Sequence, residues 1–259
     1  HSFTIGINQF ADWTDEEYER LLGLRSFGLT GSQLPVKQFE PLSNGGNIDW
    51  REHEGYVTPV KNQGPCGSCW TFSATGALEG AYFKQFGKQK VFSEKQAVDC
   101  DYLSHGCNGG LQENAFMHWM KFGAIFEENY TYSPKDGRCK EGNIGADTPV
   151  LPMAFRVDVG DQLLRDALDH GPVAISVQAR GDPFRKYTGG IIDTEDCGND
   201  IDHAILLVGY DEVNDFWTVK NSWGETWGEK GYARIKRSKG KGICGINQQN
   251  SMPVFKDDY

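Results

Sequence analysis

The chain of 259 residues is long enough for one large domain, or for two small lobes, with a substantial hydrophobic core. Its 26 Lys and Arg against 36 Asp and Glu give a formal net charge of −10, which argues against a nucleic-acid-binding protein, because phosphate contacts need a basic face. No apolar run reaches the ~18 residues of a membrane span, and a hydrophobic content of 38% argues against wholesale disorder.

The first 43 residues contain no cysteine and differ in composition from the rest of the chain. Thr14 to Glu17 has the pattern of a capping box and predicts a short helix that Gly23 ends. Residues 26–46 combine Gly, Ser, Pro and Asn without a period, which predicts an extended linker. Because the chain begins with His1 rather than Met, we expect that upstream residues were removed or not included.

Capping signals and apolar periodicity predict the remaining elements. The predicted helices are 69–86 with its apolar side chains on one face, a short helix opened by a second capping box at 93–96, 111–122 and 161–170. The predicted strands are 173–177, 204–210, 216–220 and 232–236. Helices therefore crowd the first half and strands the second, which indicates an α+β fold of two lobes.

Seven cysteines form an odd set, so six could pair into three disulfides in an oxidising compartment and leave one thiol. Cys66 and Cys69 form a C-x-x-C pair. A zinc site would need a second close pair, and the spacing of Cys100 and Cys107 is too wide. A thioredoxin-like redox motif would need a surrounding βαβ pattern, which is absent. A third interpretation makes Cys69 a nucleophile at a helix N-terminus, where the helix dipole favours the thiolate.

Residues 63–70 read Gln-Gly-Pro-Cys-Gly-Ser-Cys-Trp and contain the signature C-G-[SA]-C-[WY], which is accompanied by His and Asn about 130 to 150 residues downstream. His203, in Asp-His-Ala, and Asn221, in Lys-Asn-Ser-Trp-Gly, lie at about these distances from Cys69. On these motifs the sequence resembles the papain family of cysteine peptidases, in its cathepsin L-like branch, from Gly6 to about Phe255.

The resemblance implies a two-lobed papain-like α+β fold, with a peptidase domain at 44–259 whose helical lobe covers roughly 53–150 and whose β lobe covers roughly 151–250. It implies a cysteine endopeptidase in which Cys69 is the nucleophile and His203 exchanges protons with it. Asn221 then orients the imidazole, and Gln63 binds the oxyanion together with the backbone N–H of Cys69. Of the six histidines, His203 alone stands in this context, and we interpret the other five as surface or core residues.

The resemblance also implies disulfides and a substrate cleft. It pairs Cys66 with Cys107, Cys100 with Cys139, and Cys197 with Cys244, although six cysteines allow 15 pairings. The substrate-binding positions it implies are Gly67, Gly109, Gly110, Leu111, Gln112, Ser176, Ile201, Asp202, Ala204, Trp223 and Gln249. The S2 pocket among them is largely apolar, while the two glutamines could admit a polar P2 side chain. Trp223 is also expected to shield the bond between imidazole and asparagine from water.

Residues 6–12 resemble the G-x-N-x-F-x-D motif of the family's propeptide, at Gly6, Asn8, Phe10 and Asp12. Residues 1–43 are therefore expected to be the C-terminal part of an inhibitory propeptide that lies backwards along the cleft. We expect acid to weaken its hold, because its carboxylates lose their charge as the pH falls. These carboxylates are Asp12, Asp15, Glu16, Glu17, Glu19 and Glu40.

The implied partners are polypeptide substrates, the propeptide itself and cystatin-like inhibitors, with a monomeric chain and without nucleic acid, membrane, metal or organic cofactor. A lysosomal, endosomal or secreted setting that is acidic suits the disulfides. The triplet Asn129-Tyr130-Thr131 permits N-glycosylation there. Two alternatives stay open: a catalytically silent binding or storage protein, and a peptide ligase that keeps the same chemistry.

Overall fold

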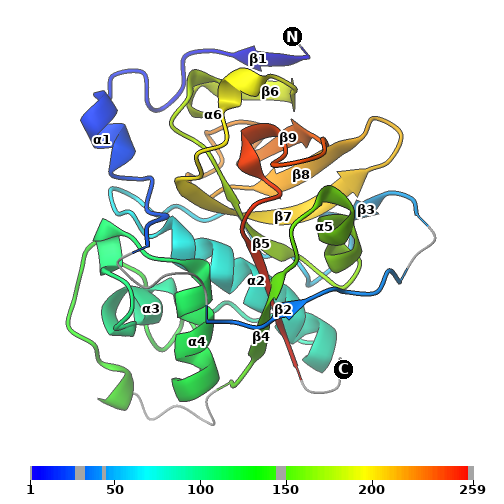
Figure 1. The fold of residues 1–259 in the computed structure, drawn as a ribbon. Helices are drawn as coiled ribbons and strands as arrows, with labels where there is room; N and C mark the ends of the chain where they lie inside the picture. The colour runs from blue at the N-terminus through cyan, green and yellow to red at the C-terminus, as the bar shows by residue number, and fades with distance from the viewer. Residues whose placement is uncertain (1, 27–32, 43–44, 144–149, 256–259) are drawn as a thin grey trace.

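A computed structural model describes residues 2–26, 33–42, 45–143 and 150–255 (Figure 1). The domain boundary predicted at 43–44 and part of the predicted linker lie outside these residues. The helices are α1 (Asp15–Glu19), α2 (Cys69–Phe86), α3 (Glu94–Cys100), α4 (Gln112–Phe122), α5 (Asp161–Leu168) and α6 (Asp182–Arg185). The strands are β1 (Phe3–Ile5), β2 (Val36–Lys37), β3 (Ile48–Asp49), β4 (Met153–Val157), β5 (Val173–Val177), β6 (Tyr187–Ile192), β7 (His203–Asp211), β8 (Phe216–Lys220), β9 (Tyr232–Lys236) and β10 (Asn250–Val254).

In the described part of the chain, one sheet runs in the order β1-β6-β9-β8-β7-β5-β10-β4-β2, with β3 paired to β7. Its centre is antiparallel: β7 pairs with β5 on one side and with β8 on the other. The pairs β6–β9 and β2–β4 are parallel. Both outermost strands, β1 and β2, come from the first 43 residues, which we call the N-terminal segment. This segment therefore closes both edges of the sheet.

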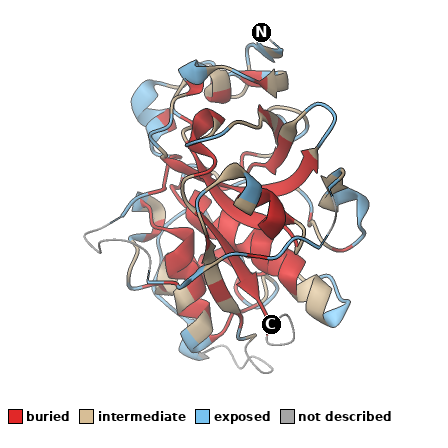
Figure 2. Cartoon of the chain, turned by 45° about the vertical axis from the view of Figure 1, so that its right-hand side comes forward, coloured by how far each residue is buried: buried red, intermediate tan, exposed pale blue. Residues whose placement is uncertain are grey.

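Helix α2 lies between the two halves of the molecule, with α3 and α4 on one side and β7 on the other (Figure 1). Every residue of α2 from Cys69 to Ala81 is buried, and Figure 2 shows the buried elements at the centre of the chain. The predicted single apolar face is therefore wrong, because the helix is covered on all sides along this stretch. No helix in the described ranges has the length and apolar character needed to cross a bilayer.

Two hydrophobic clusters fill the interior, and the N-terminal segment contributes to both. One cluster lies around the strands and includes Phe10, Tyr18 and Phe39 from the segment. The other lies around α2, α3 and α4 and includes Leu24 and Leu34. The two clusters therefore correspond to the two halves of an α+β fold, one formed by helices and one by strands.

The predicted boundaries agree with the structure for α2, β5, β8 and β9. The first helix begins as predicted, since Thr14 and Glu17 form a complete capping box, but it ends at Glu19, well before Gly23. The second capping box is half formed. Ser93 accepts a hydrogen bond from the amide of Gln96, whereas the Gln96 side chain binds the backbone of the loop that follows α4.

Several elements were not predicted, because their sequences carry weak strand or helix signals. Strand β6 contains Gly189 and Gly190, which usually weaken a strand, and β10 contains Pro253. Helix α6 has four residues, too few for a visible apolar period. Strand β2 lies inside the stretch predicted as a linker, where two residues pair with β4.

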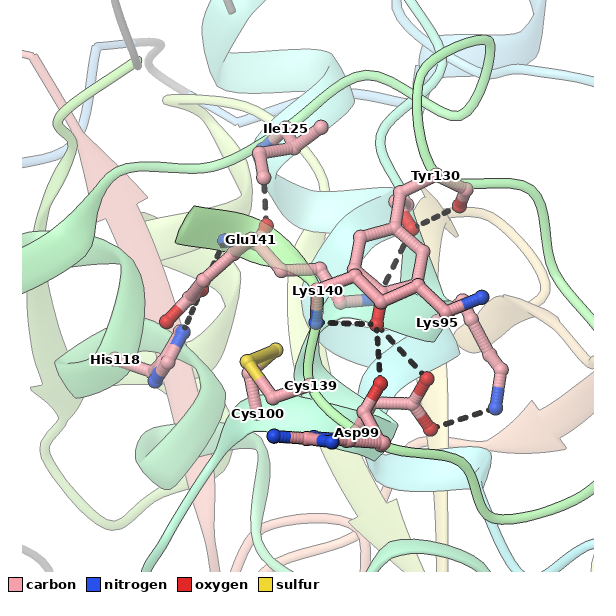
Figure 3. The surroundings of a disulfide bond; sticks show 12 residues. Lys95, Asp99, Cys100, His118, Ile125, Tyr130, Cys139, Lys140 and Glu141 are labelled. Atoms are coloured by element: carbon pink, nitrogen blue, oxygen red, sulfur yellow. Dashed lines mark hydrogen bonds and ion pairs between the residues drawn. A yellow bond between two sulfur atoms is a disulfide. The ribbon is translucent and has the colours of Figure 1, made fainter. Parts of the chain in front are cut away.

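Three disulfides join the pairs that the resemblance implies, and Cys69 is the free cysteine. Figure 3 shows the surroundings of the Cys100–Cys139 bond. There the Tyr130 hydroxyl donates a hydrogen bond of 2.9 Å to Asp99. On the other side of the bond, His118 Nε2 lies 2.9 Å from a Glu141 carboxylate oxygen. The first contact ties the loop after α4 to α3, and the second ties it to α4.

A cluster of buried charges lies beside the middle of α2. Lys61 Nζ donates to Glu79 at 2.7 Å and to Glu94 at 2.6 Å. The two carboxylates raise the pKa of Lys61 against the opposite effect of its burial. Lys220 donates to the Thr58 carbonyl at 2.7 Å, and burial lowers its pKa to about 8. Removing one partner of such a group leaves a buried charge uncompensated, at a typical cost of about 3–5 kcal/mol.

We therefore predict that Glu79→Gln lowers the free energy of unfolding by about 3 kcal/mol at neutral pH, because Lys61 loses one of its two carboxylates. The midpoint of urea unfolding measures this change. The matched control is Glu52→Gln, an exposed residue for which we expect a change of less than about 0.5 kcal/mol. Equal midpoints for both variants would contradict the prediction.

Candidate active site

Cys69 opens α2 and is fully buried. The loop before it is held by the Cys66–Cys107 disulfide and by the Gly67 amide, which donates to the Cys107 carbonyl at 2.9 Å. A Cβ on Gly67 would lie 2.6 Å from that carbonyl oxygen, so the close approach needs glycine. The first turn of a helix offers unpaired backbone N–H groups and the positive end of the dipole to the group at its N-terminus.

His203 and Asn221 are brought together by the pairing of β7 with β8. His203 is the first residue of β7 and Asn221 follows the last residue of β8. Because the two strands are antiparallel, both residues lie at the same end of the pair. His203 Nε2 lies 2.9 Å from Asn221 Oδ1. The Trp223 ring stacks on the imidazole with centroids 4.6 Å apart, and it is buried, as expected for a shield.

The hydrogen bonds define which nitrogen of His203 carries the proton. Asn221 Oδ1 also accepts a hydrogen bond from the Ser222 amide at 2.8 Å, so this atom is the acceptor oxygen. His203 Nε2 must therefore donate, and in the neutral ring Nδ1 is then the basic nitrogen. Nδ1 is buried and has no hydrogen-bond partner in the described part of the chain.

Gln63 lies between these groups and the N-terminal segment. Its amide oxygen accepts from the Ser222 hydroxyl at 2.8 Å, which orients its amide nitrogen. That nitrogen donates to the Cys66 carbonyl at 2.7 Å and to the Leu21 carbonyl at 3.0 Å. A carbonyl of the N-terminal segment thus occupies a side-chain donor of the candidate site.

The segment runs through the site with backbone hydrogen bonds to both halves of the molecule. The Leu24 amide donates to the Asp202 carbonyl at 3.1 Å. The Gly110 amide donates to the Gly23 carbonyl at 2.9 Å, and the Arg25 amide donates to the Gly110 carbonyl at 3.0 Å. This bridge between Leu24 and Gly110 is parallel. Gly110 therefore pairs with a peptide backbone, as the resemblance implies for this glycine strip.

Gly23 is required by a close contact rather than by a helix end. A Cβ on this residue would lie 1.9 Å from the Gly67 carbonyl oxygen, a distance no side chain can occupy. The backbone of the segment consequently passes directly over the loop that carries Cys69. The predicted role of Gly23 as a helix stop is corrected accordingly.

Burial shifts the pKa of both titratable groups toward their neutral forms when the segment is in place. Burial raises the pKa of the Cys69 thiol to about 12, although the backbone N–H groups of Ala204, Gly23 and Trp70 act in the opposite direction. Burial lowers the pKa of His203 to about 4, with the Asn221 hydrogen bond as the smaller, opposing cause. The environment under the segment thus disfavours a thiolate–imidazolium pair.

The apolar S2 positions lie in or against the hydrophobic cluster that contains Leu24. Leu111 and Ala204 belong to the same hydrophobic cluster as Leu24, and Ile201 packs against that cluster. The polar members are paired to different extents. Gln112 Nε2 donates to Ser176 at 2.9 Å, while Gln112 Oε1 is buried without a partner in the described residues. Gln249 donates to both carboxylate oxygens of Glu113 at 3.1 Å.

The propeptide-like motif is held by α6 and by Trp223. The Gly6 amide donates to the Lys186 carbonyl at 2.9 Å, and Asn8 Nδ2 donates to the Arg185 carbonyl at 2.8 Å. Phe10 is buried edge-on against Trp223 with ring centroids 5.1 Å apart. Asp12 is exposed.

Three residues of the site region escaped the sequence analysis. Arg185 donates to the Trp13 carbonyl at 2.7 Å, pairs with Asp15 at 2.6 Å and lies over the Tyr18 ring. It belongs to α6, which was not predicted. Glu113 is buried beneath Gln249, and burial raises its pKa. Ser222 orients Gln63. The only sequence signal for a role of Ser222 was its position directly after Asn221.

The comparisons with known proteins agree with this arrangement. Residues 45–254 match the sequence profile of the papain family cysteine proteases. The chain is 39% identical over 267 residues to the cysteine protease XCP2 of Arabidopsis thaliana, covering 98% of this chain and 74% of the relative. It is 39% identical over 265 residues to a cathepsin L-like protein of Caenorhabditis elegans, covering 98% and 78%.

Solved structures of proenzymes share the fold. The ragweed pollen cysteine protease Amb a 11 in its proform superposes with a TM-score of 0.88 at 37% identity, covering 98% of this chain and 80% of that one. Digestive procathepsin L2 of Tenebrio molitor superposes with a TM-score of 0.87 at 34% identity, covering 98% and 85%. The family match, the relatives and these proforms establish that the chain belongs to the papain family of cysteine proteases, as a zymogen.

Proposed function

We propose that this cysteine protease hydrolyses internal peptide bonds with Cys69 as the nucleophile, His203 as the proton carrier, Asn221 as its orienting group and Gln63 as an oxyanion donor. The observation that carries the proposal is the Gln63 amide, which donates to the Leu21 carbonyl of a peptide segment lying over Cys69. An amide that already binds a peptide carbonyl in the cleft is suitably placed to bind the oxyanion that forms from one.

The chemistry follows from the tautomer of His203. The thiol proton of Cys69 moves to Nδ1, and the thiolate attacks the carbonyl carbon of the substrate. The oxyanion is bound by the side chain of Gln63 and the backbone N–H of Cys69. His203 then protonates the leaving amine, and a thioester to Cys69 forms. Finally, water gives a proton to His203 and cleaves the thioester, which releases the acid and restores the thiol.

Residues 1–43 are proposed as the C-terminal part of the inhibitory propeptide and residues 44–259 as the peptidase domain, with a helical lobe at about 53–150 and a β lobe at about 151–250. The contacts of Leu21, Gly23 and Leu24 in the cleft support this division. So does the burial of Leu24 in the cluster that holds Leu111 and Ala204. On release of the propeptide these groups become accessible to substrate.

The S2 pocket is proposed to prefer an apolar P2 side chain such as Leu or Phe. Leu24 of the propeptide lies in the same hydrophobic cluster as the proposed lining residues Leu111 and Ala204, and Ile201 packs against this cluster. Gln112 and Gln249 make part of the pocket polar, and both are engaged by neighbouring side chains. A P2 amide or hydroxyl could pair with Gln112 Oε1, which has no partner in the described residues.

The cellular setting is proposed from the covalent chemistry of the chain. Three disulfides suit an oxidising, endolysosomal or secreted compartment. Asn129 is exposed, which is compatible with N-glycosylation at its sequon. In keeping with the family resemblance, we propose that the mature enzyme is a monomer and binds cystatin-like inhibitors in the cleft.

The first test is hydrolysis of a fluorogenic peptide with Leu or Phe at P2, under mild reductant, before and after incubation near pH ~4.5. We predict a rate that arises only after acid treatment and that iodoacetamide then abolishes by alkylating Cys69, the free cysteine. Cys69→Ala is the control and should be inactive. A silent binding protein would show no rate even after the propeptide is removed. A ligase would show transfer to an added amine by mass spectrometry instead of hydrolysis.

A second prediction concerns the oxyanion. Gln63→Ala should lower kcat by about 10²–10³-fold with little change in KM, because the amide binds charge that develops in the transition state. The measurement uses acid-activated enzyme quantified by covalent titration of its active thiol. Gln248→Ala is the control, since this partly exposed glutamine donates to Asn199 and Gly245 carbonyls instead. Equal kcat values for Gln63→Ala and the wild type would exclude the role.

A third prediction concerns the pH of activation. The Thr14 backbone N–H and hydroxyl lower the pKa of Glu17, because they donate hydrogen bonds to its carboxylate. The stabilisation of α1 by Glu17 is thus fully present above the ordinary pKa of 4.5 and is lost as the pH falls through the lower folded value.

Glu17→Gln should therefore shift the midpoint pH of autoprocessing upward by roughly 0.3–0.5 unit, because the cap is weakened before any acid is added. Gel analysis of propeptide loss across a pH series measures the midpoint. Glu40→Gln is the control, since its side chain is exposed and does not cap a helix. If both variants shift equally, bulk charge rather than the cap controls release.

A further inference from the structure

Arg180 lies at the end of the cleft opposite the glycine strip. It follows Ala179, whose carbonyl accepts a hydrogen bond of 2.7 Å from the Tyr18 hydroxyl of the propeptide. The Ala179 amide and Arg180 Nε both donate to the Asp202 carboxylate, at 2.7 and 2.8 Å. Asp202 directly precedes His203, so these bonds hold the guanidinium beside the proposed catalytic histidine.

Only one edge of the Arg180 guanidinium is engaged. Nε is bonded to Asp202, whereas Nη1 and Nη2 have no hydrogen-bond partner among the described residues. The side chain is 51% exposed. A guanidinium offers five N–H donors in a rigid fork that suits a carboxylate. Asp202 therefore fixes the orientation of a cation whose outer donors remain available.

The path of the propeptide shows on which side of the scissile bond this cation lies. Tyr18 contacts Ala179, Leu21 then places its carbonyl on Gln63, and Leu24 pairs with Gly110. Ala179 and Gly110 are thus on opposite sides of the proposed oxyanion donor. Under the proposed function the acyl half of a substrate lies along Gly110. The leaving-group half then passes Ala179 and Arg180.

The propeptide itself carries an acidic residue at this place. Glu19 follows Tyr18, and its negative charge, together with those of Asp202 and Asp200, raises the pKa of Arg180. The hydrogen bond to Asp202 is the largest of these causes. Asp202 is already paired with Arg180, whereas Glu19 is exposed and leaves with the propeptide, so activation removes its negative charge from the surroundings of the cation.

We infer that Arg180 is a specificity-determining residue that selects substrates with Glu or Asp at the first or second position after the scissile bond. In the zymogen, Glu19 of the propeptide supplies a negative charge in the surroundings of Arg180. The inference rests on the proposed function, because it needs the acyl half of the substrate on the Gly110 side. It gives the enzyme a preference on the leaving-group side that is independent of the S2 pocket.

The experiment uses acid-activated enzyme and internally quenched peptides that share Leu at P2. In one series the peptides differ only in having Glu, Gln or Lys at the first position after the scissile bond. In a second series the same three residues stand at the second position. We expect kcat/KM to fall in the order Glu, Gln, Lys in one of the two series, by about three- to fivefold per step, as for a partly exposed ion pair. Arg180→Gln should remove this order and Arg180→Lys should retain part of it.

The controls separate recognition from an effect on His203. A peptidyl aminomethylcoumarin has no residue after the scissile bond, so its kcat/KM and pH profile should be unchanged in Arg180→Gln. If that substrate slows equally, Arg180 acts through Asp202 and the inference is wrong. Arg138→Gln, an exposed arginine on the other lobe, should leave the order intact. Cleavage by wild-type enzyme without any preference for Glu over Lys overturns the inference and leaves the proposed function standing, whereas no cleavage of any peptide overturns both.

Discussion

The structure depends on the burial of α2 between the helical half and the sheet. This helix carries Cys69 at its N-terminus and Glu79 near its middle, and both side chains are almost fully removed from water. A buried thiol stays protonated unless a charge partner is supplied, and a buried carboxylate needs a cation. The second requirement is met by Lys61 within the fold. The charge partner that a thiolate at Cys69 would need is not supplied while the propeptide is bound.

The propeptide therefore inhibits in two ways: it blocks the cleft, and it disfavours the charged forms of Cys69 and His203. With the segment in place, Cys69 and His203 are fully buried, Gly23 lies against the loop before Cys69, and the Leu21 carbonyl accepts a hydrogen bond from Gln63. This arrangement opposes charge separation, because a thiolate and an imidazolium would both lose solvation, and the proposed oxyanion donor Gln63 is already occupied. The Leu21 carbonyl can therefore lie on Gln63 beside a neutral thiol, which is a far weaker nucleophile than the thiolate.

Elements whose pattern lies within one short segment could be predicted from the sequence, whereas those that depend on contacts between distant segments could not. Helix α2 and strands β5, β8 and β9 are predictable from local patterns, because apolar runs and a closing glycine such as Gly87 determine their ends. The motif residues around Cys69, His203 and Asn221 were identified from the family resemblance. Strands β6 and β10 were missed, since β6 contains two glycines and pairs with the N-terminal segment, and β10 contains Pro253. Arg185 and Glu113 were missed because their partners lie far away in the sequence, which local patterns do not show.

The groups that bind the propeptide in the cleft differ from the groups through which we propose that acid releases it. Its buried contacts are apolar or involve backbone groups: Phe10 and Tyr18 on Trp223, Leu24 in the helical cluster, and the hydrogen bonds to Gly110. None of these gains or loses a proton between neutral and acidic pH. Its carboxylates instead lie at the surface, where Glu17 caps α1 and Asp15 pairs with Arg185. We propose that protonation of these surface carboxylates loosens the short helix that carries Tyr18. Under this proposal the apolar contacts lose their support without any charge having to enter the core, so the energetic cost of opening the cleft in acid is small.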